Sequence, residues 1–203
     1  WLAVVGYLVW AIAGLDVSWT RVAQGSERAL RLWHGFITPN LGRSADDVWE
    51  GLIESLAMTV IATTFGVALS LPLALGAARN IAPRGLFLVC RAILATLRSF
   101  HEVILAIVFV VAVGFGPLAG AMTLIVASIG FLAKLLAEAI EAIDPASPEA
   151  IRSTGASTAT TIVYGVLPQV LPRFWGLALY RLDINFRESA VIGVVGAGGI
   201  GAT

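Results

Sequence analysis

The sequence has 203 residues, of which 58% are hydrophobic and only 13% are charged, and its mean hydropathy is +0.89. A soluble domain carries about 25% charged residues, so a water-soluble globule of this composition would expose large apolar patches. The 13 basic and 13 acidic residues cancel, which gives no net field to attract nucleic acid, and the single cysteine excludes an intramolecular disulfide. The composition predicts a protein of the lipid bilayer.

The first 50 residues hold an apolar run followed by a polar connection. Residues 1–15 carry no charge, and the sequence starts inside this run without an initiator Met or a basic segment, so no signal peptide is predicted. We expect residues 1–15 to be the remainder of a truncated first transmembrane span. Residues 16–50 carry nine charged side chains. They predict an aqueous connection with a surface helix around 20–34.

Four further stretches are long and apolar enough for transmembrane helices, which need about 20 residues. Residues 55–78 are free of charge, and residues 118–143 carry charges only near their end. Residues 86–113 contain four interrupting polar groups, which indicate one bent or broken span. Residues 174–191 form the last predicted span, and residues 51–203 together are expected to form one membrane-spanning core.

The uncharged stretch 153–172 is not predicted to span. It is rich in Ser, Thr, Gly and Pro, and these residues bring too many helix breakers and uncompensated hydroxyls for contact with lipid. We expect a pair of short helices at the membrane interface instead. Loop charges do not settle the orientation of the chain, because the excess of positive charge on either side is small.

A short helix with two specified ends precedes this stretch. Ser147 suits the N-cap, Pro148 suits the first helical position, and Glu149 faces the positive end of the helix dipole. Gly155 suits the left-handed residue that ends a helix. Because so short a helix is unstable alone in water, either its own membrane domain or a partner must hold it.

The spacing in this segment resembles the EAA loop of ATP-binding-cassette (ABC) importer permeases. Glu149-Ala150-Ile151 is followed after three residues by Gly155 and after nine more by Gly165-Val166-Leu167-Pro168. The family motif has alanine where Ile151 stands and isoleucine where Gly165 stands. In that family the loop is cytoplasmic and docks its helix into a cleft of the ATPase subunit. The resemblance implies that loop 144–172 docks an ATPase through Glu149, Ala150, Ile151, Arg152, Gly155, Ala156, Leu167 and Pro168.

Other blocks are similar to the permease subunit of phosphonate importers, and together they cover roughly residues 51–201. They are 77–83, 112–120, 134–144, 165–169 and 196–201. The resemblance implies an all-α, polytopic transmembrane helix bundle of the type I ABC importer permease kind, with a short cytoplasmic coupling helix, in the cell inner membrane. It implies import of phosphonates or related phosphorus oxyanions (phosphite, phosphate) by alternating access, and residues 16–50 then lie outside the cytoplasm.

The same resemblance implies the partners. They are two copies of an ABC ATPase subunit, a second permease copy in a homodimer, and an extracytoplasmic substrate-binding protein. The sequence has no G-x-x-x-x-G-K-[ST] loop, and Lys134 is its only lysine, so this chain does not cradle ATP phosphates in the usual way. We expect no cofactor in this chain, and ATP and Mg in the partner ATPase.

Charged residues inside the predicted spans are candidates for the translocation path. A charge at mid-bilayer costs about 2.5–3.5 kcal/mol, so such groups pair or face a wet cavity. Arg98 and Glu102 are four residues apart, as are Asp183 and Arg187, so each pair is predicted to form an ion pair along one helix. One interpretation is packing alone. The other is a path or gate for an anion, formed by Arg98, His101, Glu102, Asp183, Arg187 and Glu188.

The glycine cluster near the end of the sequence satisfies G-x-G-x-x-G, but a span precedes it and the helix and acid of a dinucleotide site do not follow it. We predict a tightly packed turn, in which only glycine allows close backbone approach. The residues of this turn are Gly196, Gly198, Gly199 and Gly201.

Catalysis is not predicted. His34 and His101 are the only histidines, no paired metal-ligand spacing occurs, and no nucleophile stands beside a base. Two alternatives stay open. One is a permease for another solute such as methionine, because the EAA loop is shared across substrates. The other is an integral-membrane enzyme that would use the buried charges Arg98, Glu102, Asp183 and Glu188.

Overall fold

The computed structural model describes residues 1–14, 18–37 and 41–202. The chain divides into two compact units, Trp1–Ala45 and Asp46–Thr203. Within the described residues every regular element is a helix.

The first unit contains two helices and the start of a third. Helix α1 (Leu2–Gly14) is apolar, with 13 residues. Helix α2 (Trp19–Ile37) carries an exposed ion pair between Glu27 and Arg31 at 2.8 Å. Its position agrees with the surface helix predicted around 20–34, and the predicted boundary between residues 15 and 16 lies outside the described residues.

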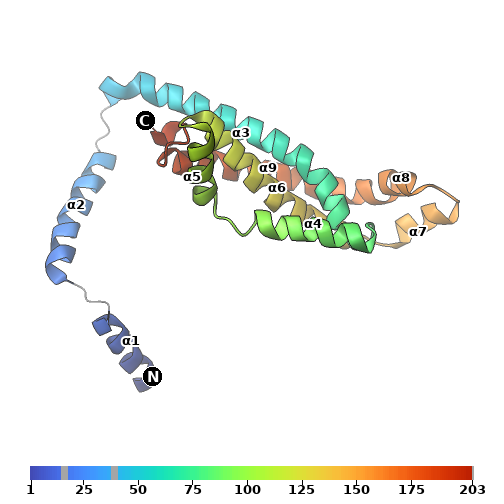
Figure 1. The fold of residues 1–203 in the computed structure, drawn as a ribbon, viewed down its shortest axis with the longest axis horizontal. Coiled ribbons are helices and arrows are strands. Elements are labelled where there is room, and N and C mark those ends of the chain that lie inside the picture. The colour runs from blue at the N-terminus through green and yellow to red at the C-terminus, as the bar shows by residue number, and fades with distance from the viewer. Residues whose placement is uncertain (15–17, 38–40, 203) are drawn as a thin grey trace. The chain divides into compact units, whose positions relative to one another are not determined.

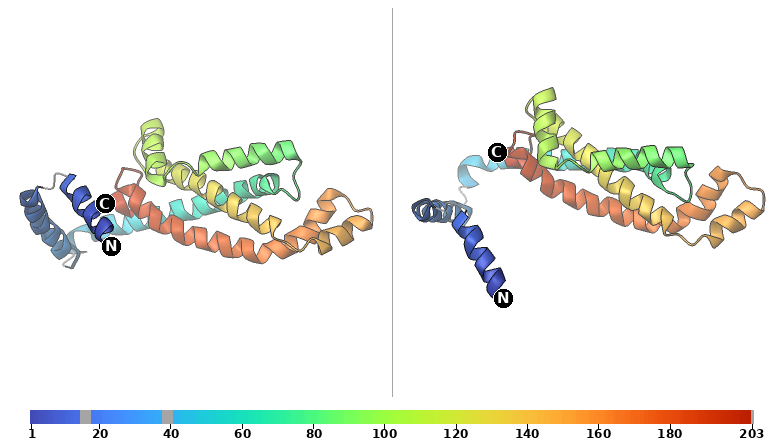
Figure 2. Two further views of the ribbon diagram at one scale, coloured as in Figure 1. Left: turned by 90° about the horizontal axis from the view of Figure 1, so that it is seen from below. Right: turned by 60° about the horizontal axis from the view of Figure 1, so that its bottom comes forward.

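The second unit is built around a central helix, α6 (Pro117–Glu141). Helices α4 (Arg84–Leu97), α5 (Glu102–Val113) and α9 (Leu167–Gly193) pack against it, and the 37-residue helix α3 (Leu41–Ala77) runs beside it (Figures 1 and 2). The short helices α7 (Ala146–Ser153) and α8 (Thr158–Thr161) follow α6 and lie at one end of this unit (Figure 1).

Three helical stretches of the described residues are long and apolar enough to cross a membrane: Ala45–Ala77, Pro117–Glu141 and Thr158–Gly193. A fourth crossing is possible if α4 and α5 count as one broken span, since these helices are bent by 86°. The bend predicted for residues 86–113 is therefore present. It falls at residues 98–101, between Leu97 and Glu102.

The stretch 153–172 differs from the two separate interfacial helices that we expected. Helix α7 (Ala146–Ser153) is short, but α8 (Thr158–Thr161) continues through a π-helical turn, η1 (Ile162–Val166), directly into α9. The final helix thus begins well before residue 174. Its hydroxyls are satisfied locally, since Thr161 Oγ1 donates to the Ser157 carbonyl at 3.1 Å, and Pro168 lies in the first turn of α9, where proline is tolerated.

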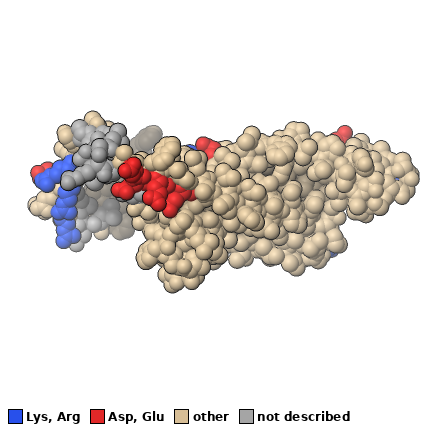
Figure 3. All heavy atoms as spheres, turned by 90° about the horizontal axis from the view of Figure 1, so that it is seen from above, with Lys and Arg blue, Asp and Glu red and all other residues tan. Residues whose placement is uncertain are grey.

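Small side chains dominate the buried core. Two apolar clusters lie toward opposite ends of the unit, one around Ala74, Ala133 and Val166 and the other around Ala62, Ala119 and Ile192. Alanine and glycine let membrane helices approach closely where lipid offers no hydrophobic driving force between them. Figure 3 shows that the face of the second unit along these helices is almost free of charge, and that acidic side chains gather at one end.

Candidate functional site

A polar network lies between the two apolar clusters, in the middle of the bundle. Asn185 on α9 donates through Nδ2 to Thr63 Oγ1 on α3 at 2.9 Å and to Ser128 Oγ on α6 at 3.0 Å. All three residues are buried, and a Cβ on Gly66 would collide with the side chain of Ser128. The network therefore fixes three helices against one another at one level of the bundle.

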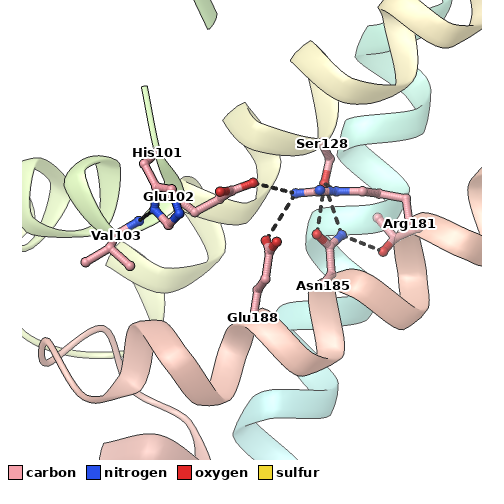
Figure 4. Close-up of polar contacts among 8 residues, drawn as sticks. His101, Glu102, Val103, Ser128, Arg181, Asn185 and Glu188 are labelled. Carbon is pink, nitrogen blue, oxygen red and sulfur yellow. Dashed lines mark hydrogen bonds and ion pairs between the residues drawn. The ribbon is translucent and has the colours of Figure 1, made fainter. Parts of the chain in front are cut away.

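Arg181 extends this network toward a cavity. Its side chain is only 3% exposed, and its Nε donates to Ser128 Oγ at 2.9 Å. Its terminal Nη2 lies 3.5 Å from Glu188 Oε2 and 3.9 Å from Glu102 Oε1 (Figure 4). The guanidinium also lies 5.4 Å from the centre of the Phe131 ring, within the range of a cation–π contact. A buried arginine thus faces two carboxylates from two different helices.

The cavity beside Arg181 has a volume of about 380 Å³. It is bounded by the break between α4 and α5, where residues 99–101 are exposed, and by side chains of α6 and α9. Its lining residues are Leu97, Arg98, Ser99, Phe100, His101, Glu102, Ala127, Phe131 and Arg181. The lining combines two arginines, a histidine and a carboxylate with aromatic walls, which is the chemistry of a polar passage inside an apolar bundle.

The helix break changes the predicted pairing of Arg98. We expected Arg98 and Glu102 to form an ion pair along one helix, and that expectation is wrong. Arg98 caps the end of α4, whereas Glu102 begins α5 and turns to Arg181 on α9. His101 caps α5 through Nδ1, which accepts from the Val103 N–H at 3.3 Å.

The predicted pair of Asp183 and Arg187 is confirmed, at 3.0 Å. Both side chains are more than 60% exposed, and neither lines the cavity. Of the six predicted path residues, the structure therefore brings Arg98, His101, Glu102 and Glu188 to or beside the cavity. It places Asp183 and Arg187 on the outer surface of α9.

The second candidate site is the loop that carries α7. Glu149, Ala150 and Arg152 are exposed on this helix, and Ile151 is half-buried. Gly155 ends the segment with φ of +80°, the left-handed conformation that was predicted. The remaining candidates, Ala156, Leu167 and Pro168, lie along the same loop and at the start of α9, and Leu167 and Pro168 are exposed.

The start of α7 differs from the prediction. The helix begins at Ala146, and Pro145 occupies the N-cap without a side-chain hydrogen bond. Asp144, not Ser147, accepts the free N–H of Ala146, at 3.0 Å from Oδ1. Pro148 was predicted at the first helical position and is the third residue of the helix instead. It is buried because it lies against Gly165, where a Cβ would come within 2.9 Å of Pro148 Cα. The departure of Gly165 from the family motif thus permits close contact between α7 and η1.

The base of this loop is joined to the rest of the bundle. Glu141 Oε1, at the end of α6, accepts from the backbone N–H of Arg79 at 2.8 Å and from Arg91 Nη2 at 3.0 Å. Arg91 Nε also donates to the Ala77 carbonyl at 2.9 Å. The turn between α3 and α4 is therefore tied to the helix that leads into the loop.

The glycine turn packs tightly against the opposite end of the unit. Gly196, Gly198 and Gly199 have positive φ angles, and the Gly196 carbonyl accepts from the Gly116 N–H at 3.0 Å. The Gly199 N–H donates to Glu54 Oε2 at 2.9 Å, so it is occupied by a carboxylate of α3. Gly201 lies against Ala190 and Gly193, where a side chain would collide with the backbone. The turn therefore contacts α3, the start of α6, and α9.

Sequence reasoning did not assign Thr63, Ser128, Arg181 and Asn185 to a site. A usable signal was present, because an amide or a hydroxyl inside an otherwise apolar stretch must find a partner in the bundle interior. That signal shows that a partner exists but does not identify it.

Comparison with known proteins agrees with this architecture. The model of the family described as binding-protein-dependent transport system inner membrane component matches residues 66–203. The MetNI methionine ABC transporter, solved in an inward-facing conformation, matches with a TM-score of 0.67 and 30% identity, over 81% of this chain and 79% of that one.

Two curated relatives are more similar in sequence. The phosphate-import permease protein PhnE of Mycolicibacterium smegmatis is 45% identical over 166 residues, which are 81% of this chain and 31% of that protein. The phosphite transport system permease protein PtxC of Stutzerimonas stutzeri is 50% identical over 151 residues, 74% of this chain and 55% of that protein. The chain thus spans less than two thirds of the length of either relative.

Proposed function

The chain belongs to the family of binding-protein-dependent transport system inner membrane components, and we propose that it is the permease subunit of an ATP-driven importer of phosphonates or related phosphorus oxyanions, including phosphite and phosphate. It is a multi-pass membrane protein, and we place it in the cell inner membrane. The two relatives named for phosphate and phosphite are 45% and 50% identical, against 30% for the methionine transporter. This difference favours phosphorus compounds over methionine, the second candidate substrate.

The observation that carries the proposal is the exposed helix α7, held firmly at one end of the membrane unit. Glu149 and Arg152 are exposed on it, while Pro148 is fixed against Gly165. A short helix that is rigid at its base and open on its outer face suits insertion into the groove of a partner. We infer that this partner is the ATPase subunit, on the cytoplasmic side, and that residues 16–50 lie on the other side.

The path for the solute follows the cavity at the break between α4 and α5. Arg98 and His101 at the break are groups that attract or hydrogen-bond an oxyanion, and Arg181 forms the inner wall. A path must bind weakly, since the solute has to leave as well as enter. High affinity then belongs to an extracytoplasmic binding protein. For Asp183 and Arg187 a role in the path stays a prediction.

The active assembly contains two permease copies, identical to each other, two ATPase subunits and the binding protein. This chain is not an enzyme and holds no cofactor of its own, and the partner subunit binds ATP and Mg. Closure of the two ATPases on ATP would move the α7 loops together and switch access to the cavity from one side of the membrane to the other.

The experiment is ligand-dependent ATP hydrolysis by the complete complex reconstituted in lipid. The cognate binding protein is loaded in turn with methylphosphonate, phosphite, phosphate and methionine. We expect stimulation by the phosphorus compounds and none by methionine. Stimulation by methionine alone would contradict the proposed substrate, and chemical conversion of the ligand by the permease without its ATPase would favour the membrane-enzyme alternative.

A further inference from the structure

Arg181 has two carboxylate partners, and these lie on two different helices. Glu188 lies seven residues further along α9, the helix that carries Arg181. Glu102 comes from α5, across the cavity, and its carboxylate is 3.9 Å from the same Nη2 atom. Figure 4 shows the two glutamates approaching the guanidinium from different elements.

The guanidinium itself has little freedom to move. Its Nε is fixed by Ser128, one face lies toward Phe131, and the side chain is only 3% exposed. Ser128 is in turn held by Asn185. Because the inner part of the side chain is anchored on α6 and α9, its outer nitrogen keeps its direction toward the cavity.

Glu102 is the partner that can be removed. It is the first residue of α5, directly after the four-residue break at 98–101 and the 86° bend. A shift of α5 relative to α9 separates Glu102 from Arg181 but leaves Glu188 in place, since Glu188 and Arg181 share one helix. We propose that Arg181 is the oxyanion-binding residue of the cavity, and that Glu102 occupies it until a phosphorus oxyanion takes its place.

The charges around the cavity support the replacement of Glu102 by an anion. Arg98 and Arg181 together carry two positive charges, and Glu102 and Glu188 carry two negative ones, so the charges of these four groups cancel in this state. Withdrawal of Glu102 leaves one net positive charge inside the bundle, where charge interactions are little screened. The cavity thus attracts an anion in one conformation and releases it in the other, which is what a path requires.

The ligand class follows from the shape of the donor. A guanidinium donates N–H groups to the oxygens of an anion, and both carboxylates and phosphorus oxyanions offer such acceptor oxygens. An oxygen of a phosphonate or phosphite can therefore take the place of the Glu102 oxygen that lies 3.9 Å from Arg181 Nη2. The cavity of about 380 Å³ leaves room for an organic substituent on the phosphorus atom. This inference rests on the proposed function, because it specifies how the path handles its substrate.

The test is direct binding of methylphosphonate to the permease–ATPase complex in lipid nanodiscs, without the binding protein, followed by phosphorus NMR. We expect Glu102→Gln to tighten binding by about tenfold or more, because it removes the negative charge that competes with the anion for Arg181. Glu138→Gln is the matched control, since it removes a carboxylate from a partly exposed ion pair with Lys134 outside the cavity lining, and it should leave binding unchanged.

Arg181→Gln alone leaves two glutamates without their partner, so the double variant Arg181→Gln with Glu102→Gln is the sharper test. We expect the double variant to bind methylphosphonate without the increase in affinity that Glu102→Gln alone produces. A gain that persists without Arg181, or an unaltered affinity in Glu102→Gln, would overturn the inference. If the complex imports phosphonate but fails this binding test, the proposed function stands and the replacement of Glu102 by the anion is disproved. If the complex passes the binding test but imports only methionine, the anion site at Arg181 stands and the proposed substrate class is disproved.

Discussion

The side chain of Gln169 and the backbone of Asp144 form a two-way bridge. Gln169 Oε1 accepts from the Asp144 N–H at 3.1 Å, and Gln169 Nε2 donates to the Asp144 carbonyl at 3.3 Å. The same amide nitrogen donates to the Gly165 carbonyl at 2.8 Å. The bridge joins the chain after α6 to the first turn of α9 and so closes the loop that carries α7.

Gln169→Ala should loosen this loop without unfolding the bundle. Each lost hydrogen bond costs about 0.5–1.5 kcal/mol, so the amides of α7 should exchange with solvent faster, while the helical content stays the same. Hydrogen exchange followed by mass spectrometry measures this effect. Gln24→Ala, at an exposed position of α2, is the control, and equal exchange of α7 in both variants would contradict the role of the bridge.

Gly165→Ala should displace α7. A Cβ at this position lies 2.9 Å from Pro148 Cα and 3.1 Å from Ile151 Cδ1, so the short helix must move away from η1. We expect reduced recovery of the ATPase subunit with the purified permease. Gly176→Ala, in α9, meets no atom within 4 Å and should leave recovery unaltered.

Glu149→Ala combined with Gly155→Pro should abolish association with the ATPase. Gly155 has φ of +80°, whereas proline is fixed near −65°, so the end of the loop cannot keep its path. The exposed carboxylate of Glu149 is lost at the same time. The variant should still reach the membrane at the normal level, as judged by fractionation, and unchanged co-purification of the ATPase would disprove docking through this helix.

Thr63→Val should destabilise the bundle more than Thr64→Val. Thr63 accepts a hydrogen bond from Asn185 on another helix, whereas the exposed Thr64 donates only to the Val60 carbonyl of its own helix. Hydrogen bonds between membrane helices contribute about 0.6 kcal/mol on average and up to about 1.7 kcal/mol. Unfolding of the two variants in lipid or mild detergent measures the difference, and equal stability would show that the Asn185 contact contributes nothing.

Arg98→Gln and Arg187→Ala separate the two surfaces that carry candidate path residues. Arg98 lines the cavity, and Arg187 lies in an exposed ion pair outside it. If the solute follows the cavity, Arg98→Gln should reduce uptake of radiolabelled phosphonate while assembly is preserved. Loss of uptake in Arg187→Ala as well would show that the path also follows the outer face of α9. Full uptake in Arg187→Ala would show that the ion pair of Asp183 and Arg187 serves packing alone.

Several features of the structure could be predicted from the chemistry of neighbouring residues in the sequence. The bend after Leu97 follows from charges inside an apolar stretch, and the end of α7 follows from a glycine that can adopt a positive φ. The pair of Asp183 and Arg187 follows from a spacing of four residues on an unbroken helix. Each of these inferences depends only on residues that are neighbours in the sequence.

Features that depend on neighbours in space were missed. The spacing of Arg98 and Glu102 predicts an ion pair only if one helix contains both, and the break at 98–101 removes that condition. The partners of Arg181 come from three helices, so no spacing along the sequence identifies them. The continuity of α8 with α9 was also missed, because the hydroxyls of that stretch bond to carbonyls of their own helix.

The helical stretch from Thr158 to Gly193, which includes a π-helical turn and Pro172, gives the molecule a long lever arm. It has 36 residues, and Arg181 stands about 35 Å from its first turn at the usual rise of 1.5 Å per residue. A tilt imposed beside α7 that is passed on through the π-helical turn and Pro172 reaches Arg181 as a sideways displacement that grows with distance. Glu102 stands on α5, after the break at 98–101, and so belongs to a different helix from the one that would tilt.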